Sequence, residues 1–152
     1  MGELTPAIEG KLIAFDSAPL IYYLEEHPTY IAIADELFDA IDRGSARGIT
    51  SVLTLLEVLV APLRSGRHDL AKAFRELLIH AANITIHSID EAVCEQAARL
   101  RAKYSWLRTP DALQIATAIE HHAQVVVTND DRWKTLVEMR VVVLKDYLAA
   151  QK

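Results

Sequence analysis

The sequence contains little of what disulfide-bonded or zinc-binding proteins need. Its 152 residues include one cysteine, Cys94, so no disulfide can form within the chain. The six histidines do not form a pair one helical turn apart near a third ligand, as zinc sites often require. We therefore expect neither a disulfide framework nor a zinc site.

Positive charge and long apolar runs are also scarce. Lysine and arginine total 16 against 21 acidic residues, a net charge of −5, which argues against binding nucleic acid through bulk positive charge. Any such contact would be local and bridged by metal. The longest apolar stretch, residues 52–63, contains Glu57 and is too short to span a bilayer. Residues 1–10 do not resemble a secretory signal, so we expect a soluble cytoplasmic protein.

Glycine and proline number only five each, and linkers and repeats are absent, so we expect a single domain over residues 1–152 with an N-terminal extension at 1–10. Short apolar runs predict strands at 11–15, 46–49, 84–87, 124–127 and 141–144. Helical spacing predicts helices at 18–25, 30–43, 52–63, 70–82, 89–104 and 109–121, and a helical turn at 131–136. This alternation predicts an α/β fold, a three-layer α/β/α sandwich around a mainly parallel central sheet.

Three helix starts have recognisable capping residues. Thr50 or Ser51 can cap the helix over 52–63. Ser88, with Glu91 three residues later, matches a capping box. In the segment 109–111, we expect Thr109 to be the cap, followed by a proline at the first helical position and an early acid.

Two aspartates follow predicted strands. Asp16 comes directly after the first strand and Asp130 follows the fourth, so both should emerge at the carboxyl edge of a parallel sheet, where such folds bind ligands. Asp111 lies in the first turn of its helix, where the dipole favours an anion by about 0.3–1 kcal/mol. An aspartate there is also common in helices without any site.

Glu57 interrupts a segment that is apolar on nearly every side, and we expect this helix to be buried all round. An ionised carboxylate is costly there unless it is paired or binds a metal. A solvent-filled groove or a distant arginine are the alternatives.

Together these acids predict a chemistry. Converging carboxylates repel one another unless a cation lies between them, and oxygen ligands suit magnesium or manganese. Two such ions about 3.5–4 Å apart can promote in-line displacement at phosphorus. Phosphodiester hydrolysis is the reaction we expect.

Four segments also resemble a known family: FDSAPLIYYLEEH, SVLTLLEVL, RTPDALQIATAI and VVVTNDDRW. In this order and spacing they resemble the PIN-domain family, including VapC-type toxin ribonucleases. The resemblance implies that the catalytic and metal-binding acids are Asp16, Glu57, Asp111 and Asp130. It implies supporting roles for Ser17, Thr128, Asn129 and Asp131, and Asp131 is an alternative to Asp130 as the fourth ligand.

The resemblance further implies a magnesium- or manganese-dependent endoribonuclease that cuts single-stranded RNA. It implies a homodimer silenced by a cognate antitoxin protein, with a toxin favoured over a repair or housekeeping nuclease. A non-catalytic RNA- or protein-binding module on the same scaffold is the main alternative. An aspartyl phosphatase is disfavoured, because no second acid lies two residues after Asp16.

Basic and aromatic residues near the acids complete the expected site. Arg108, three residues before Asp111, is the best candidate for contacting a phosphate or an antitoxin carboxylate. Trp106 and Trp133 could stack on RNA bases, although tryptophans in loops often only cover the edge of a core.

Overall fold

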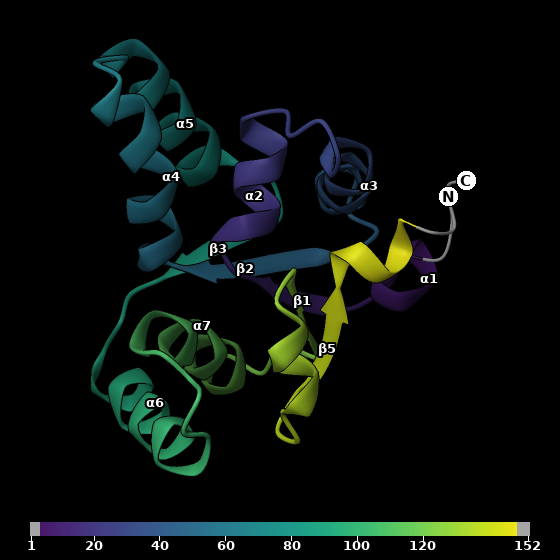
Figure 1. The fold of residues 1–152 in the computed structure, drawn as a ribbon. Helices are drawn as coiled ribbons and strands as arrows, with labels where there is room; N and C mark the ends of the chain where they lie inside the picture. Colours follow the sequence, from purple (N-terminus) through teal and green to yellow (C-terminus); the bar gives the residue numbers. More distant parts are fainter. Residues whose placement is uncertain (1–3, 149–152) are drawn as a thin grey trace.

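The computed structural model describes residues 4–148 and contains one parallel five-stranded sheet (Figure 1). The strands are β1 (Leu12–Phe15), β2 (Arg47–Ser51), β3 (Ile84–His87), β4 (Val125–Thr128) and β5 (Arg140–Val143). Their order is β3-β2-β1-β4-β5, and every neighbouring pair is parallel. Because β1 and β4 are neighbours, the residues that follow them emerge side by side at one edge.

The connections between strands are helical. The α-helices are α1 (Leu4–Ile8), α2 (Ser17–Leu24), α3 (Ile31–Asp42), α4 (Val52–Arg64), α5 (His68–His80), α6 (Glu91–Lys103) and α7 (Thr109–Glu120). Two 3₁₀ turns, η1 (Asp131–Thr135) and η2 (Leu144–Tyr147), follow β4 and β5. Figure 1 shows α2 to α5 on one face of the sheet and α6 and α7 on the other.

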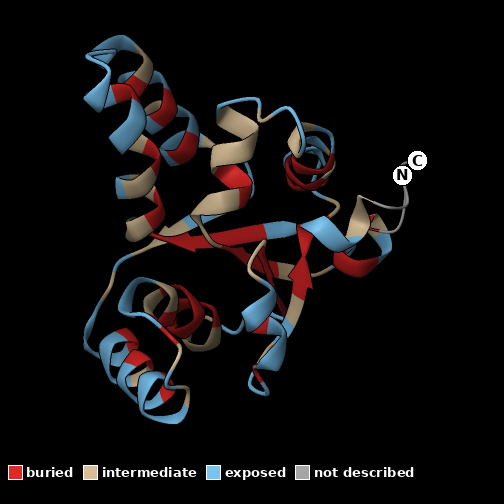
Figure 2. Cartoon of the chain, viewed as in Figure 1, coloured by how far each residue is buried: buried red, intermediate tan, exposed pale blue. Residues whose placement is uncertain are grey.

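Each face of the sheet has its own hydrophobic core, because side chains alternate along a strand. In β1, Ile13 and Phe15 pack with α1 to α5, whereas Ala14 packs with α6 and α7. In β4, Val127 faces the first core and Val126 the second. The buried residues accordingly line both faces of the sheet (Figure 2). The expected three-layer α/β/α sandwich is confirmed.

The predicted strands all occur within a few residues of their expected bounds, but two helix starts were wrong. Asp90, not Ser88, caps α6, because its carboxylate accepts a hydrogen bond from Val93 N at 3.0 Å. At α7, Arg108 is the cap residue and Thr109 is already helical. Ser51 caps α4 as expected, accepting a hydrogen bond from Leu53 N at 3.2 Å. Helix α1 lies within the expected extension and was not predicted.

The expectation that α4 is buried all round was wrong. Four apolar side chains form an exposed stripe on this helix, Val52 (38%), Leu56 (58%), Val60 (39%) and Leu63 (47%). Their spacing of three or four residues places them on one side. Val58, on another side, packs into the core with only 1% exposed. Between residues 4 and 148, no helix is long and apolar enough to cross a membrane.

Candidate functional site

Asp16 is the innermost of the four acids. It follows β1 and occupies the cap position of α2, and Thr128 Oγ1 at the end of β4 donates to its Oδ2 at 2.8 Å. Its Oδ1 is buried and has no hydrogen-bond partner among the described residues. Burial raises the pKa of Asp16 to about 7; the Thr128 bond opposes the rise, and the charges of Asp111 and Glu57 add to it. Within residues 4–148, Asp16 is therefore a buried carboxyl without a compensating positive charge.

Glu57 approaches Asp16 from the helix after β2. Its Oε1 accepts a 2.7 Å hydrogen bond from Ser17 Oγ, in the first turn of α2. The residue is half-buried, and the structure places no Lys or Arg in an ion pair with it within residues 4–148. Ser17 thus joins two segments that are 40 residues apart and orients the glutamate toward the strand end.

Asp111 lies in the first turn of α7, as expected. Partial burial raises its pKa, and the negative charges of Asp130 and Glu57 raise it further, while Arg132 and Arg108 act in the opposite direction. Two of the other acids therefore raise the pKa of Asp111, just as Glu57 and Asp111 raise the pKa of Asp16. The four carboxylates share one electrostatic environment at the carboxyl edge of the sheet.

Asp130 and Asp131 face different partners. Asp130 accepts hydrogen bonds from Arg132 Nε at 3.1 Å and Nη2 at 2.7 Å, and this arginine lowers its pKa. Asp131 is exposed, and its pKa is lowered by Lys145 and Lys134, with ion pairs of 3.0 and 3.3 Å. Only Asp130 of the two influences Asp111. The geometry favours Asp130 as the fourth acid.

The fit of a divalent ion can be judged from these contacts. Within the described residues, no group of three or more His, Cys, Asp or Glu side chains is arranged to hold a metal ion. The acids therefore lie near one another but are not arranged as the ligands of one ion. The donors are nevertheless all oxygens, and Asp16 Oδ1 is a buried acceptor without a donor. A hard cation fits this donor set.

A buried polar network beneath the acids was not anticipated. Gln114, one turn after Asp111 and only 5% exposed, accepts from Ser51 Oγ at 2.9 Å and donates to Thr54 Oγ1 at 2.9 Å. Thr50 Oγ1 lies 2.7 Å from Thr54 Oγ1 and donates to the Phe15 carbonyl at 2.8 Å. The network ties β1, β2, α4 and α7 together. A lone glutamine in the apolar run ALQIA was the available signal.

The supporting residues occupy distinct positions. Asn129 donates to the Tyr22 hydroxyl at 3.1 Å and accepts from Lys145 N at 2.9 Å, which fixes the loop after β4. Trp133 is fully buried, so it cannot stack on a base. Trp106 is half-buried, and its ring centroid lies 5.5 Å from the Arg132 guanidinium carbon. Arg108 is exposed beside Asp111.

Comparison with protein families identifies the class. The model of the PIN domain matches residues 13–138, and the chain belongs to the PIN domain family. The match contains all four acids. No curated protein matches the sequence at a significant level.

Solved structures share this fold. A toxin-antitoxin complex from Klebsiella pneumoniae matches with a TM-score of 0.65 and 21% identity, covering 86% of this chain and 96% of that chain. DNA-bound VapBC from Salmonella typhimurium gives 0.68 and 19%, covering 88% and 98%. Mycobacterium tuberculosis VapC20, a toxin that cleaves the sarcin-ricin loop, gives 0.67 and 17%, covering 84% and 98%. At these identities the likeness establishes the fold.

Proposed function

We propose that this protein is a magnesium- or manganese-dependent endoribonuclease that hydrolyses single-stranded RNA and is the toxin of a toxin–antitoxin pair. The observation that carries the proposal is Asp16, a buried carboxyl whose Oδ1 has no donor and whose neighbours include Glu57 and Asp111. Such an arrangement is costly for stability and is found preferentially at functional sites. Membership of the PIN domain family supports the same conclusion.

Each residue has a proposed role. Asp16, Glu57, Asp111 and Asp130 would hold the divalent ion, which supplies positive charge to the scissile phosphate and acidity to a water. Thr128 donates to Asp16 and leaves its other oxygen free for ligation. Ser17 likewise occupies one oxygen of Glu57. These two hydroxyls orient the carboxylates.

The alternative is a module that binds RNA or protein without turnover. The absence of a ready-made ligand group within residues 4–148 is the observation that favours it. The two functions differ in metal binding, because a module without turnover needs no divalent ion at the acids.

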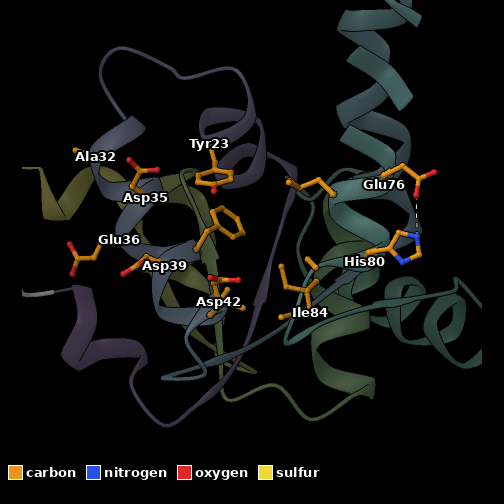
Figure 3. Close-up of a pocket in the computed structure, with 14 residues that line it drawn as sticks. Tyr23, Ala32, Asp35, Glu36, Asp39, Asp42, Glu76, His80 and Ile84 are labelled. Carbon is orange, nitrogen blue, oxygen red and sulfur yellow. Dashed lines mark ion pairs between the residues drawn. The ribbon is translucent and has the colours of Figure 1, made fainter. Parts of the chain in front are cut away.

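We also propose a protein partner, as the neighbours' toxin–antitoxin complexes suggest. An open groove of about 920 Å³ lies between α3 and α5, lined by apolar side chains such as Phe38, Ile41 and Leu77 (Figure 3). Acidic residues border it, namely Asp35, Glu36, Asp39, Asp42 and Glu76. None of the four site acids lines the groove. The chemistry of the groove fits an amphipathic antitoxin segment whose polar side carries Lys or Arg.

The double variant Asp35→Lys with Asp42→Lys should weaken the binding of such an antitoxin, and unchanged affinity would count against this placement.

The exposed stripe of α4 supports a second interaction. Four apolar side chains on one helix face form a surface that an isolated soluble domain rarely exposes. We propose that it contacts the same stripe of a second copy in a homodimer. Leu56→Glu should then yield a monomer in light scattering, whereas a dimer of unchanged mass would exclude this surface.

The decisive experiment measures both metal binding and cleavage. Calorimetry with manganese should detect binding to the wild-type protein, and Glu57→Gln and Asp111→Asn should each weaken it. A labelled single-stranded RNA should be cut by the wild type with magnesium or manganese and not with EDTA. Full cleavage by both variants, with unchanged circular dichroism, would refute the proposed site. Absence of manganese binding at millimolar concentration would favour the binding module.

A further inference from the structure

Arg132 pairs with Asp130, so a metal ion would have to compete with this arginine for the carboxylate. Its Nη2 and Nε donate to the two oxygens of Asp130, at 2.7 and 3.1 Å. The Arg132 backbone N–H adds a 2.9 Å bond to Asp130 Oδ1. A bidentate pair of this kind satisfies both carboxylate oxygens and fixes their orientation. Asp130 is thereby engaged by the chain's own cation.

Within residues 4–148, none of the other three acids forms an ion pair with a Lys or Arg, although Arg132 and Arg108 act to lower the pKa of Asp111. Asp16 accepts a hydrogen bond from the Thr128 hydroxyl, and Glu57 accepts one from the Ser17 hydroxyl. The neighbouring Asp131 pairs with Lys134 and Lys145 instead. Arg132 therefore forms its ion pair with Asp130, the site acid in the loop after β4.

Arg132 also has a second anchor. Its guanidinium carbon lies 5.5 Å from the centroid of Trp106, within the range of a cation–π contact. The side chain is about half exposed, at 54%, so it can rotate without opening the core. If Asp130 were engaged elsewhere, the guanidinium would keep its aromatic support and have free N–H donors. A phosphate diester accepts such donors in the same bidentate geometry.

We propose that Arg132 is a displaceable counter-ion of Asp130: a divalent ion releases it, and the released guanidinium, supported by Trp106, contacts a phosphate of the RNA. This inference rests on the proposed nuclease function. Arg132 is a positioning residue toward the metal and a binding residue toward RNA. In this state Asp130 is held by Arg132 and is not arranged as a metal ligand.

Calorimetric titration with manganese tests the first half. In Arg132→Met, Asp130 no longer has a competing cation, so the manganese Kd should fall by about fivefold, the equivalent of an exposed ion pair. Arg132→Lys keeps the charge without the fork and should give an intermediate value. Arg140→Met removes another exposed arginine, one without an ion pair in the described part of the chain, and should leave the Kd unchanged. We expect these variants to fold, because Arg132 and Arg140 are exposed and the backbone bond from Arg132 to Asp130 does not depend on the side chain at position 132.

Steady-state cleavage at saturating manganese tests the second half. Arg132→Met should raise the KM for single-stranded RNA several-fold with a smaller change in kcat, and Trp106→Leu should raise KM without altering the manganese Kd. A manganese Kd within twofold of wild type in Arg132→Met would overturn the counter-ion assignment. An unchanged KM in both variants would overturn the phosphate contact. Failure of the wild type to bind manganese would overturn the nuclease function as well, whereas manganese binding that requires Asp16 but ignores Arg132 would overturn this inference alone.

Discussion

The inner and outer halves of the acid site differ in what controls the pKa of their carboxyl groups. The inner half contains Asp16, whose Oδ1 is buried without a donor and whose pKa is raised to about 7 by burial. The outer half contains Asp130, which lies at the rim with its pKa lowered by Arg132. Desolvation controls the pKa of Asp16, and the ion pair with Arg132 controls the pKa of Asp130.

Of these two carboxyls, the inner one depends more on an added cation. An unpaired buried carboxylate is expensive and tends to take up a proton instead. A cation that binds at Asp16 would remove this penalty, whereas at Asp130 it must first displace an arginine. We therefore expect the inner acid to dominate metal binding and the outer acid to modulate it.

The largest effect should follow removal of the inner charge. Asp16→Asn keeps the shape of the side chain, and asparagine is also favoured at a helix cap position, but the variant loses the charge that would attract the ion. RNA cleavage should fall roughly 10³-fold, because the metal contributes several kcal/mol to transition-state stabilisation. Multiple-turnover cleavage of a labelled RNA measures this, with the exposed Glu95→Gln on α6 as control. A loss of less than tenfold would show that the inner half is not the centre of the site.

The outer acid should matter less. Asp130→Asn should reduce cleavage about 10- to 100-fold, the range for residues that tune a metal site. Asp131→Asn is the matched control, because its carboxylate pairs with Lys134 and Lys145 and should change cleavage less than about twofold. Equal losses in the two variants would remove the distinction between these neighbours.

The layers of the fold could be predicted from the sequence because buried parallel strands form short apolar runs. VVV in β4 and the ITIH of β3 were sufficient to place both strands. The burial of α4 could not be predicted, since its sequence is apolar on almost every side. Which side meets the core depends on where neighbouring elements pack, and that information is not local.

The acids of the site could be located from strand ends and from the family resemblance, but their electrostatic partners could not. Arg132 lies two residues after Asp130, and only the 3₁₀ turn brings its guanidinium back to that carboxylate. Gln114 bonds to Ser51 and Thr54, which lie 63 and 60 residues away in the sequence, respectively. Contacts of this kind arise from packing of distant elements and leave little trace in local spacing.

The smallest effect, a pH dependence of stability in metal-free protein, separates the two halves most directly. Unfolded aspartate has a pKa near 3.8, and Asp16 in the folded protein titrates at about 7. Its contribution to stability is fully present below the unfolded pKa and is lost as pH rises through the folded pKa, because the native state retains a proton that the unfolded chain releases. At pH 8 Asp16→Asn should therefore melt higher than wild type by roughly 5 °C, and the difference should vanish near pH 4. Differential scanning calorimetry in EDTA measures this difference in melting temperature.

The pKa of Asp130 is shifted in the opposite direction, so Asp130→Asn should not raise the melting temperature at pH 8. Equal melting temperatures of wild type and Asp16→Asn at pH 8 would mean that the inner carboxyl carries no desolvation penalty, and the argument for a cation there would fail.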